Sequence, residues 1–428
     1  MAQQFEILFL LPLFLLPLIF FIFKIFKSSK ITQLPPGPTP WPVIGNIFQI
    51  GNMPHITLTN FARTYGPLIS LRLGTQCLVV GSSPSVAIEI FKTHDRILSG
   101  RYVPNAVRSN GTNLEKTSLG WKSECDSGWR YLRTLCRTEL FAGKVLESQA
   151  CLREKKVMEL VEFLRSKEGE VVNIGELVFA TVLNMLSNVL ISKDMINLEE
   201  ETEDGEIKSL VRGIVEVGSA PNISDFYPIL GKLDLQGLRK KIYRFSDKEL
   251  LSAGSDTSTT AIEWAMAELI KNVVTMKKVQ EELEIELSES DYLKESQVLQ
   301  MSYVQACVKE AFRLHPPAPL LLPHRLYRNT PDPFIWEERT CLDARFTSSD
   351  MDFKGNDFEF LPFSAGRRMC PGMPMAAIQV PLVLASLVHF FDWELPHGKC
   401  PVELDMTEKF GITLQKKEPL LLIPKARK

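Results

Sequence analysis

The spacing of apolar residues along most of the chain is that of amphipathic helices, since apolar positions recur at helical intervals among good helix formers. Two short runs rich in Val, Ile and Leu, LISLRLG (68–74) and CLVVGSS (77–83), instead predict the strands of a hairpin. The expected fold class is therefore mainly α with a small β region near the N-terminal third. The predicted helices lie near residues 55–65, 84–93, 128–141, 146–166, 175–191, 249–271, 273–287, 301–314 and 372–391.

An apolar run at the N-terminus departs from this amphipathic pattern. Residues 7–23 are uncharged and almost wholly apolar, near the lower limit of about 17–25 residues for a membrane span. A cleaved secretory signal is the alternative, but MAQQFE carries no positive charge before the run and no small-residue cleavage site follows it. Lys24, Lys27 and Lys30 come after the run. We therefore expect residues 1–30 to form a retained transmembrane helix, with the rest of the chain in the cytosol.

A proline-rich connector follows this anchor. LPPGPTPWPVIG (34–45) contains prolines that forbid a continuous helix and stiffen the chain, so residues 31–50 are assigned to the connector. The length of 428 residues allows about three domains. No linker-like stretch or repeat divides the remainder, so residues 51–428 are expected to form one large catalytic domain.

The charge balance gives no case for a nucleic-acid partner. Lys and Arg number 49 against 51 Asp and Glu, for a formal net charge of -2. A chain that binds nucleic acid through its phosphates would carry a basic excess.

The eight cysteines predict neither zinc nor a disulfide framework, because they form no C-x-x-C pair and no His cluster accompanies them. Dinucleotide-binding and phosphate-loop motifs are also absent from the sequence. If the protein carries out redox chemistry, a partner protein is therefore expected to bind the nicotinamide.

One cysteine has unusual neighbours, in FSAGRRMCPG (363–372). Most free cysteines are small buried apolar residues, and Cys370 alone would be interpreted that way. The surrounding residues instead suit a thiolate that ligates haem iron. Gly366 would permit a tight turn, Arg368 would reach a haem propionate, and Gly372 would leave room for a helix to pack against the ring.

The remaining neighbours fit the same interpretation. Pro371 suits the first turn of a helix, which would place Cys370 at a helix N-terminus where the thiolate is favoured. Phe363 would cover the proximal face of the ring. The spacing F-x-x-G-x-R-x-C-x-G resembles the haem-ligand signature of the cytochrome P-450 family, with every fixed position present. This resemblance implies the family's α-helical, triangular-prism fold with haem b between two long helices.

A second motif, LLSAGSDTSTTAIEWA (250–265), resembles the family's oxygen-binding helix. Its resemblance implies that Ala253 and Gly254 line the space beside the iron. Thr257 can bond back to the carbonyl four residues earlier. Asp256 and Thr257 would together relay protons to the distal oxygen. The alternative is an ordinary helix start capped by Ser or Asp.

KEAFRLHPP (309–317) places Glu310 and Arg313 on one helical face, where such pairs are usually surface salt bridges. The family resemblance instead implies a buried pair that an arginine nearer the cysteine completes as a triad. Arg345 is the candidate for that third member.

Two more propionate contacts follow from the resemblance. WRYLR (129–133) matches W-x-x-x-R, so Trp129 and Arg133 would meet one propionate. His324, in LLLPHR, matches a position that often contacts the other. Taken alone, each would be an ordinary helix-surface or loop residue.

Longer stretches, such as FKTHDRILSGRYVP (91–104) and EKFGITLQKKEPLLLIPK (408–425), look like plant microsomal members that act on benzylisoquinoline alkaloids, N-methylcoclaurine 3'-hydroxylases in particular. That implies aromatic hydroxylation or phenol coupling of a small apolar or aromatic substrate, although a neighbouring group hydroxylates terpenoids. It also implies dioxygen, an NADPH-cytochrome reductase partner, and contact with lipid of the endoplasmic reticulum membrane.

Two junctions depart from the family pattern. Near residues 241–249 the oxygen helix begins almost at once, where relatives have a further helix, a connector and half of the long helix. Near residues 325–346 only fragments of a hairpin and strand region remain. The alternatives are therefore a catalytically impaired haem protein, a remnant that does not fold, or a plain helical membrane-tethered scaffold.

Overall fold

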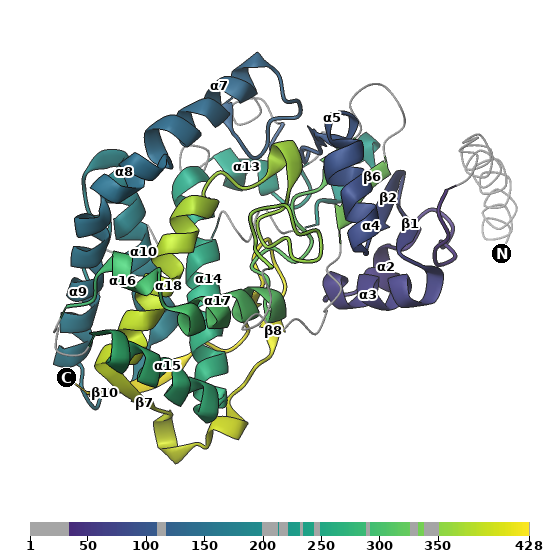
Figure 1. Ribbon diagram of the computed structural model, residues 1–428. Helices are drawn as coiled ribbons and strands as arrows, with labels where there is room; N and C mark the ends of the chain where they lie inside the picture. The colour runs from purple at the N-terminus through teal and green to yellow at the C-terminus, as the bar shows by residue number, and fades with distance from the viewer. Residues whose placement is uncertain are drawn as a thin grey trace, which may run out of the picture.

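The computed structural model describes residues 34–108, 117–198, 213, 221–231, 234–243, 249–287, 292–325, 333–337 and 351–427. The predicted anchor, Arg345 and most of the 325–346 junction lie outside these residues. Within them the molecule is mainly helical with small sheets, as the sequence predicts (Figure 1).

The predicted helices are present, although their ends differ by a few residues. The 146–166 segment is two helices that meet at Gln149, and π-turns continue α4 and α7 over Glu89–Thr93 and Cys136–Leu140. The α-helices are α2 (Ile47–Ile50), α3 (Pro54–Tyr65), α4 (Pro84–Ile88), α5 (Asp95–Leu98), α7 (Ser127–Leu135), α8 (Gly143–Ser148), α9 (Ala150–Ser166), α10 (Ile174–Ile191), α12 (Ile223–Phe226), α13 (Leu238–Tyr243), α14 (Glu249–Lys271), α15 (Val273–Leu287), α16 (Glu295–Val298), α17 (Ser302–Leu314) and α18 (Met373–Phe390).

The predicted hairpin opens the larger sheet. Strands β1 (Leu68–Leu73) and β2 (Gln76–Gly81) pair antiparallel, and β2 then pairs in parallel with β6 (Pro333–Glu337). The sheet order is β1-β2-β6-β5-β3, where β5 is His324–Arg325 and β3 is Gly100–Arg101. The short β3–β5 pair matters for the site, because it sets Arg101 opposite His324.

The sequence did not predict two smaller sheets near the C-terminus. The first has the order β4-β10-β7, from Val172–Asn173, Leu421–Ala426 and Phe391–Glu394. The second is the hairpin of β8 (Glu408–Lys409) and β9 (Gln415–Lys416), which brings the chain back against α14.

The main core lies among α9, α10, α14, α15, α17 and α18 (Figure 1). Helices α10 and α14 pack together most extensively, and Trp264 and Leu183 are fully buried. Burial of each such side chain stabilises the fold by about 1.5–3 kcal/mol. By length and composition α10 and α18 would also pass as membrane spans, but 61% and 72% of their apolar windows are buried, so they serve as core helices.

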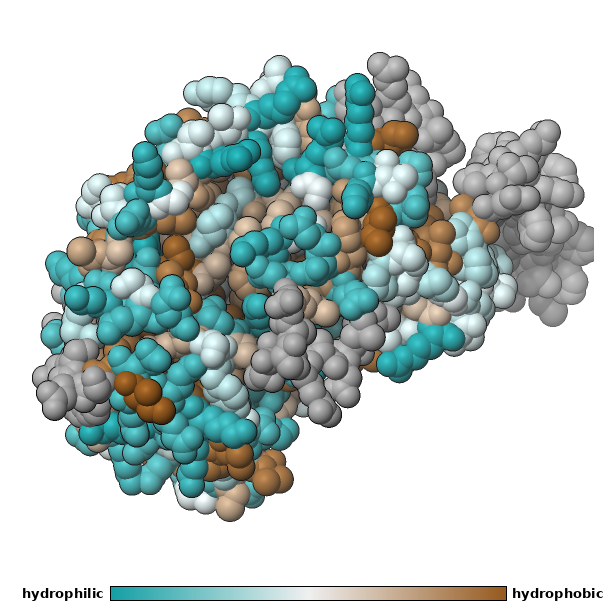
Figure 2. Space-filling view, viewed as in Figure 1, coloured by the Kyte–Doolittle hydropathy of each residue, from teal (hydrophilic) through white to brown (hydrophobic). Residues whose placement is uncertain are grey.

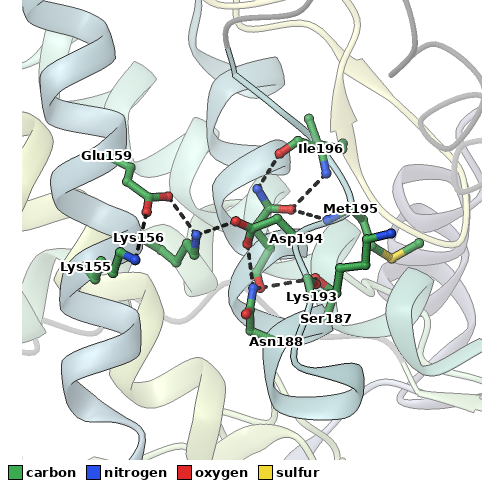
Figure 3. A network of polar contacts seen from close by, with 10 residues as sticks. Lys155, Lys156, Glu159, Ser187, Asn188, Lys193, Asp194, Met195 and Ile196 are labelled. Carbon is green, nitrogen blue, oxygen red and sulfur yellow. Dashed lines mark hydrogen bonds and ion pairs between the residues drawn. The ribbon is translucent and has the colours of Figure 1, made fainter.

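A polar network holds the chain that follows α10 against α9 (Figure 3). The ammonium group of Lys156 donates to Glu159 and Asp194 over 2.8 and 2.6 Å. The amide of Asn188 donates to the same Asp194 carboxylate over 2.5 Å, and Ser192 ends α10 with a left-handed φ of 53°. These contacts fix the C-terminal end of α10, which is the helix that packs on α14.

The N-terminal sheet region lies beside the helical body and packs a small apolar cluster of its own, which Leu320 joins from the chain after α17 (Figure 1). On the face that Figure 2 shows, hydrophilic side chains predominate and apolar side chains form separate small groups.

Candidate functional site

Cys370 ends a tight loop that leads into α18. Residues Gly366–Arg368 form a 3₁₀ turn, and the backbone N–H of Cys370 donates to the carbonyl of Phe363 over 2.9 Å. Gly366 has a φ of +66°, and a Cβ there would lie 2.6 Å from Oδ1 of Asp95, so the turn requires glycine. The same carboxylate accepts the N–H of Arg367 over 2.8 Å. The loop is therefore fixed against α5.

The prediction for Pro371 was wrong in detail. Helix α18 begins at Met373 with Gly372 as its N-cap, and Pro374 occupies the first turn, because residues 371 and 372 form a turn of their own. The helix start still faces the sulfur. Desolvation raises the pKa of the Cys370 thiol, although its side chain has exposed surface, while the N–H groups of Gly372 and Met373 lower that pKa.

An aromatic cluster supports the loop from one side. The ring of Phe363 packs edge-on against Phe312 of α17 and tilted against Phe353, with centroids 5.4 Å apart in both pairs. Phe363 is thus held between the cysteine loop and α17.

Three guanidinium groups gather on another side of the loop. Arg133 of α7 donates to the carbonyl of Met369, next to Cys370, and its guanidinium lies 5.9 Å from the ring centroid of Trp129. Arg368 lies 4.9 Å from the same centroid and donates to the carbonyls of Ser99 and Lys122 over 2.8 Å each. Trp129 therefore serves as a shared platform for two cations.

The third guanidinium is that of Arg101 in β3, which the sequence did not single out. Arg101 is 5% exposed and donates to the carbonyl of Leu322, but its Nε has no hydrogen-bond partner among the residues that the structure describes. Burial and the neighbouring Arg368 lower the pKa of Arg101 to about 9. No local motif marks this arginine, since its setting depends on the pairing of β3 with β5.

His324 lies opposite Arg101 and is buried. Its Nδ1 lies 2.7 Å from the carbonyl of Leu98, so Nδ1 carries the proton and donates it. Burial, followed by the charge of Arg101, lowers the pKa of His324 to about 3. The ring is therefore neutral near pH 7.

These groups fit a flat, dianionic ligand. The ion pairs among the described residues include no carboxylate partner for Arg101, Arg133 or Arg368. A buried cation without a counter-ion is unfavourable, and the two propionates of haem b would supply the missing charge. The donor set and the thiol beside it are therefore those that a haem with a cysteine ligand needs.

Helix α14 presents the second predicted motif. Ala253 is exposed in an otherwise buried stretch of the helix, and the hydroxyl of Thr257 donates to its carbonyl over 2.8 Å, which confirms the predicted back-bond. A Cβ at Gly254 would lie 2.6 Å from Cδ2 of Leu186. Close packing of α10 on α14 is thus a reason for glycine that the sequence did not suggest.

Asp256 points elsewhere than its neighbour Thr257. The carboxylate is 5% exposed and accepts hydrogen bonds from Thr413 over 2.5 Å and from Gln415 over 3.0 Å. Both donors come from the C-terminal hairpin. Asp256 and Thr257, the two predicted relay residues, are adjacent in sequence but have different polar partners in the structure.

Glu310 and Arg313 form the predicted pair, with two nitrogen–oxygen contacts of 2.8 and 2.7 Å. The Glu310 side chain is 39% exposed, so the pair is less enclosed than the resemblance implies. Arg345, its predicted third member, lies outside the described residues.

The fold and the site together define a helical protein built to hold haem against a cysteine. The family model described as Cytochrome P450 matches residues 35–248, 246–331 and 343–423. The chain belongs to the cytochrome P450 family, and is a monooxygenase of that family with a haem-thiolate cofactor. Dioxygen and a reductase partner follow from this membership.

Plant enzymes are among its relatives. The chain is 41% identical to the probable (S)-N-methylcoclaurine 3'-hydroxylase isozyme 2 of Coptis japonica, over 95% of this chain and 96% of the relative. It is 40% identical to corytuberine synthase of the same plant, over 97% of this chain and 99% of the relative. It is 39% identical to (S)-N-methylcoclaurine 3'-hydroxylase isozyme 1 of Papaver somniferum, over 95% of this chain and 98% of the relative.

These alignments also bear on the two junctions. The first spans 473 positions, whereas the whole chain has 428 residues, so at least 45 positions have no counterpart here. The family match likewise breaks near residue 248 and between 331 and 343, at the junctions that the sequence marks as shortened.

Proposed function

We propose that this chain inserts one atom of dioxygen into a small apolar or aromatic plant metabolite and reduces the other atom to water. Electrons come from NADPH through a separate membrane-bound cytochrome reductase. The observation that carries this proposal is the position of Cys370, between the start of α18 and three arginines that have no carboxylate partner among the described residues. Relatives that bear the names of alkaloid-modifying enzymes support a benzylisoquinoline alkaloid as the substrate. The reaction is then aromatic hydroxylation. In the alternative, oxidative phenol coupling, the substrate loses two hydrogens as the new bond forms, no oxygen atom is inserted, and both atoms of dioxygen leave as water.

Cys370 is the proposed axial ligand of the haem iron. Haem bound through a thiolate supplies an electron-rich iron that favours cleavage of the O–O bond. The protein's part is to keep the sulfur as a thiolate. Desolvation raises the pKa of the Cys370 thiol, and the N–H groups of Gly372 and Met373 and the nearby Arg133 oppose that effect.

The arginine cluster orients the cofactor in this proposal. Arg101, whose Nε has no hydrogen-bond partner among the described residues, would bind a propionate, as would Arg133 and Arg368, which lie over the ring of Trp129. His324 lies beside Arg101 and would contact the other propionate, while its Nδ1 donates to the carbonyl of Leu98.

On the other side of the haem, α14 serves the oxygen chemistry. Ala253, which is exposed, would leave space beside the iron, whereas Gly254 faces Leu186 of α10, and Thr257 and Asp256 would pass protons from solvent toward that space. The hydroxyl of Thr257 is held by its own helix, so it can reorient without a change in the fold.

The anchor of residues 1–30 and the connector of 31–50 hold the catalytic domain, 51–428, at the cytosolic face of the endoplasmic reticulum. The apolar run at 7–23 and the microsomal character of similar plant enzymes support this location.

The test is the absorption spectrum of the reduced, carbon monoxide-bound protein. Wild type and Cys400→Ser, which changes another exposed cysteine, should show the Soret band typical of a thiolate ligand. Cys370→Ser should lose that band. A thiolate-type spectrum that survives Cys370→Ser refutes the assignment.

A second candidate, a catalytically impaired haem protein, is favoured by the alignment positions that lack a counterpart here. That candidate binds haem with the same spectrum but consumes NADPH without forming a hydroxylated or coupled product. Product analysis with (S)-N-methylcoclaurine and reductase separates the two.

A further inference from the structure

The environment of Asp256 assigns a role to two residues of the C-terminal hairpin. Asp256 lies on α14 and its two carboxylate oxygens are engaged separately. The Thr413 hydroxyl donates to Oδ2 over 2.5 Å, and the Gln415 amide donates to Oδ1 over 3.0 Å. Thr413 is 2% exposed and Asp256 5%, so water competes little for these bonds. The carboxylate is held from two directions inside the protein.

The hairpin that supplies these donors is itself fixed to α14. Thr413 lies in the bend that precedes β9 and Gln415 begins β9, and both side chains reach the carboxylate of Asp256. The carbonyl of Leu414 accepts the indole N–H of Trp264 over 2.7 Å, and the Lys416 ammonium lies 4.7 Å from the Trp264 ring centroid. Because Trp264 lies two turns along the same helix, the donors and the carboxylate form one rigid unit.

This arrangement has a chemical consequence for an acid that must pass on protons. Two donated hydrogen bonds favour the ionised carboxylate and fix its rotamer. A carboxylate oxygen has two lone pairs, so it can take a proton on one while it still accepts a hydrogen bond on the other. The Thr413 hydroxyl can reverse, because it can accept as well as donate, whereas the Gln415 amide N–H can only donate.

We propose that Thr413 and Gln415 are positioning residues that fix the carboxylate of Asp256 beside α14, and that proton delivery through Asp256 depends on this fixed position. This inference rests on the proposed function, since it assumes that Asp256 serves proton delivery. The protons come from solvent, and the hydrogen bonds from Thr413 and Gln415, together called the clamp, do not change how many are delivered. The clamp fixes the position of the Asp256 carboxylate between proton transfers. The alternative is that the two bonds only fasten the hairpin to α14.

The experiment uses the full-length, haem-loaded protein with its reductase. Thr413→Val keeps the shape and removes the hydroxyl, Thr413→Ser restores it, and Gln415→Met removes the amide. Thr407→Val is the matched control, because the Thr407 hydroxyl also bonds an aspartate, Asp405, elsewhere in this hairpin. The fraction of NADPH electrons released as hydrogen peroxide should rise several-fold in Thr413→Val and Gln415→Met. It should return to the wild-type value in Thr413→Ser and stay there in Thr407→Val.

A second measurement does not depend on turnover. Melting temperatures of Thr413→Val, Asp256→Asn and the double variant form a cycle, and the losses should be less than additive if the bond exists. If the losses in melting temperature are additive, the proposal is overturned. It is also overturned if the losses are not additive but the peroxide fraction is unchanged, because the two hydrogen bonds would then be purely structural. Should Thr413→Val not fold, Gln415→Met answers the same question. If wild type lacks the thiolate-type spectrum the proposed function fails, and the melting cycle still reports on the clamp.

Discussion

The imidazole ring of His315 lies flat against the indole of Trp264, with ring centroids 3.8 Å apart and 5° between the planes. Stacked in this way, the imidazole Nε2 lies 2.9 Å from Glu268 and Nδ1 lies 3.3 Å from Glu408. Glu408 also lies 2.9 Å from His55 of α3. One chain of alternating acids and imidazoles thus joins α3, the end of α14, the end of α17 and the β8–β9 hairpin.

This chain predicts a pH window for stability. Burial lowers the pKa of His315, but its hydrogen bonds to Glu268 and Glu408 outweigh that effect, so the pKa is raised overall. Burial raises the pKa of Glu408, yet its bonds to His315 and His55 lower it to about 2. A histidine whose pKa is raised in the folded state adds stability below about pH 6.5, and this stability is lost as the pH rises through the pKa of the folded state. A glutamate whose pKa is lowered adds stability above about pH 4.3, and this stability is lost as the pH falls through the pKa of the folded state. The contribution should therefore be largest between those two values.

We expect His315→Gln to lower the free energy of unfolding by about 1–3 kcal/mol near pH 5.5, with a smaller loss above pH 8. Denaturant titrations across pH 4.5–9 measure this difference. His94→Gln is the matched control, because His94 pairs with Glu89 on the surface at 55% exposure and should have little effect. A loss for His315→Gln that is constant with pH would contradict the charged network.

Local sequence predicts much of the fold, and most of the elements that it misses depend on contacts between residues far apart in the chain. The helix periods and the hairpin at 68–81 could be predicted because each is decided by neighbours in sequence. Strand β10 could not, since Leu421–Ala426 contains Pro424 and pairs with β4 and β7, which lie far away in sequence. The break between α8 and α9 at Gln149 also lacks a proline or glycine to mark it.

The site divides in the same way. The Cys370 loop could be predicted because its residues sit within one short motif. Arg101 could not, because its burial depends on β3 meeting β5, more than 200 positions along the chain. The partners of Asp256 were missed for the same reason, since Thr413 and Gln415 come from a hairpin far from α14 in sequence.

Arg101 should prove more important to the cofactor than to the apoprotein. A buried guanidinium with an unpaired Nε costs free energy, so Arg101→Met should leave the apoprotein as stable or make it slightly more stable. The loss of a charge-assisted bond of about 1.5–3 kcal/mol should speed haem release at least tenfold. Haem transfer to an acceptor protein measures the rate, with Arg96→Met on the exposed side of α5 as control. Equal release rates would exclude the assigned propionate contact.

Thr257 should affect coupling and leave haem binding intact. Among the described residues, its hydroxyl bonds to the Ala253 carbonyl of its own helix, so Thr257→Val should keep the carbon monoxide spectrum and the melting temperature within a few degrees. The amount of peroxide released per NADPH should rise at least severalfold, and by about 10–100-fold at most, because a proton donor is lost. Thr257→Ser should restore coupling. Thr181→Val provides the comparison, because Thr181 makes the same back-bond to Leu177 in α10 and should leave coupling unchanged.

Removal of residues 1–30 should release the protein from membranes at least in part, because the apolar run at 7–23 is the proposed span. Sedimentation of membranes after a carbonate wash measures the bound fraction of the full and shortened chains. Recovery of a natural chain that starts after residue 30 in a secreted fraction would replace the anchor by a signal peptide.

The two shortened junctions should lower stability and turnover relative to a chain that carries the usual segments. Helix α13 ends at Tyr243 and α14 begins at Glu249, and an extended residue spans only about 3.3–3.6 Å, so little chain is available to set α14 in register.

Inserting the missing segments of the Coptis japonica relative at both junctions tests this directly. Each strand or helix group that regains a partner should recover about 1–3 kcal/mol, because buried unpaired backbone groups are costly. We therefore expect higher haem occupancy, a higher melting temperature and faster turnover in the restored chain. Single insertions should each recover part of the gain, since the junctions flank different elements of the site: the first precedes α14 with Asp256 and Thr257, and the second lies between His324 and Cys370. Equal haem occupancy, melting temperature and turnover in the present and restored chains would show that the shorter connections suffice to bring α14, β5 and the Cys370 loop to the same haem.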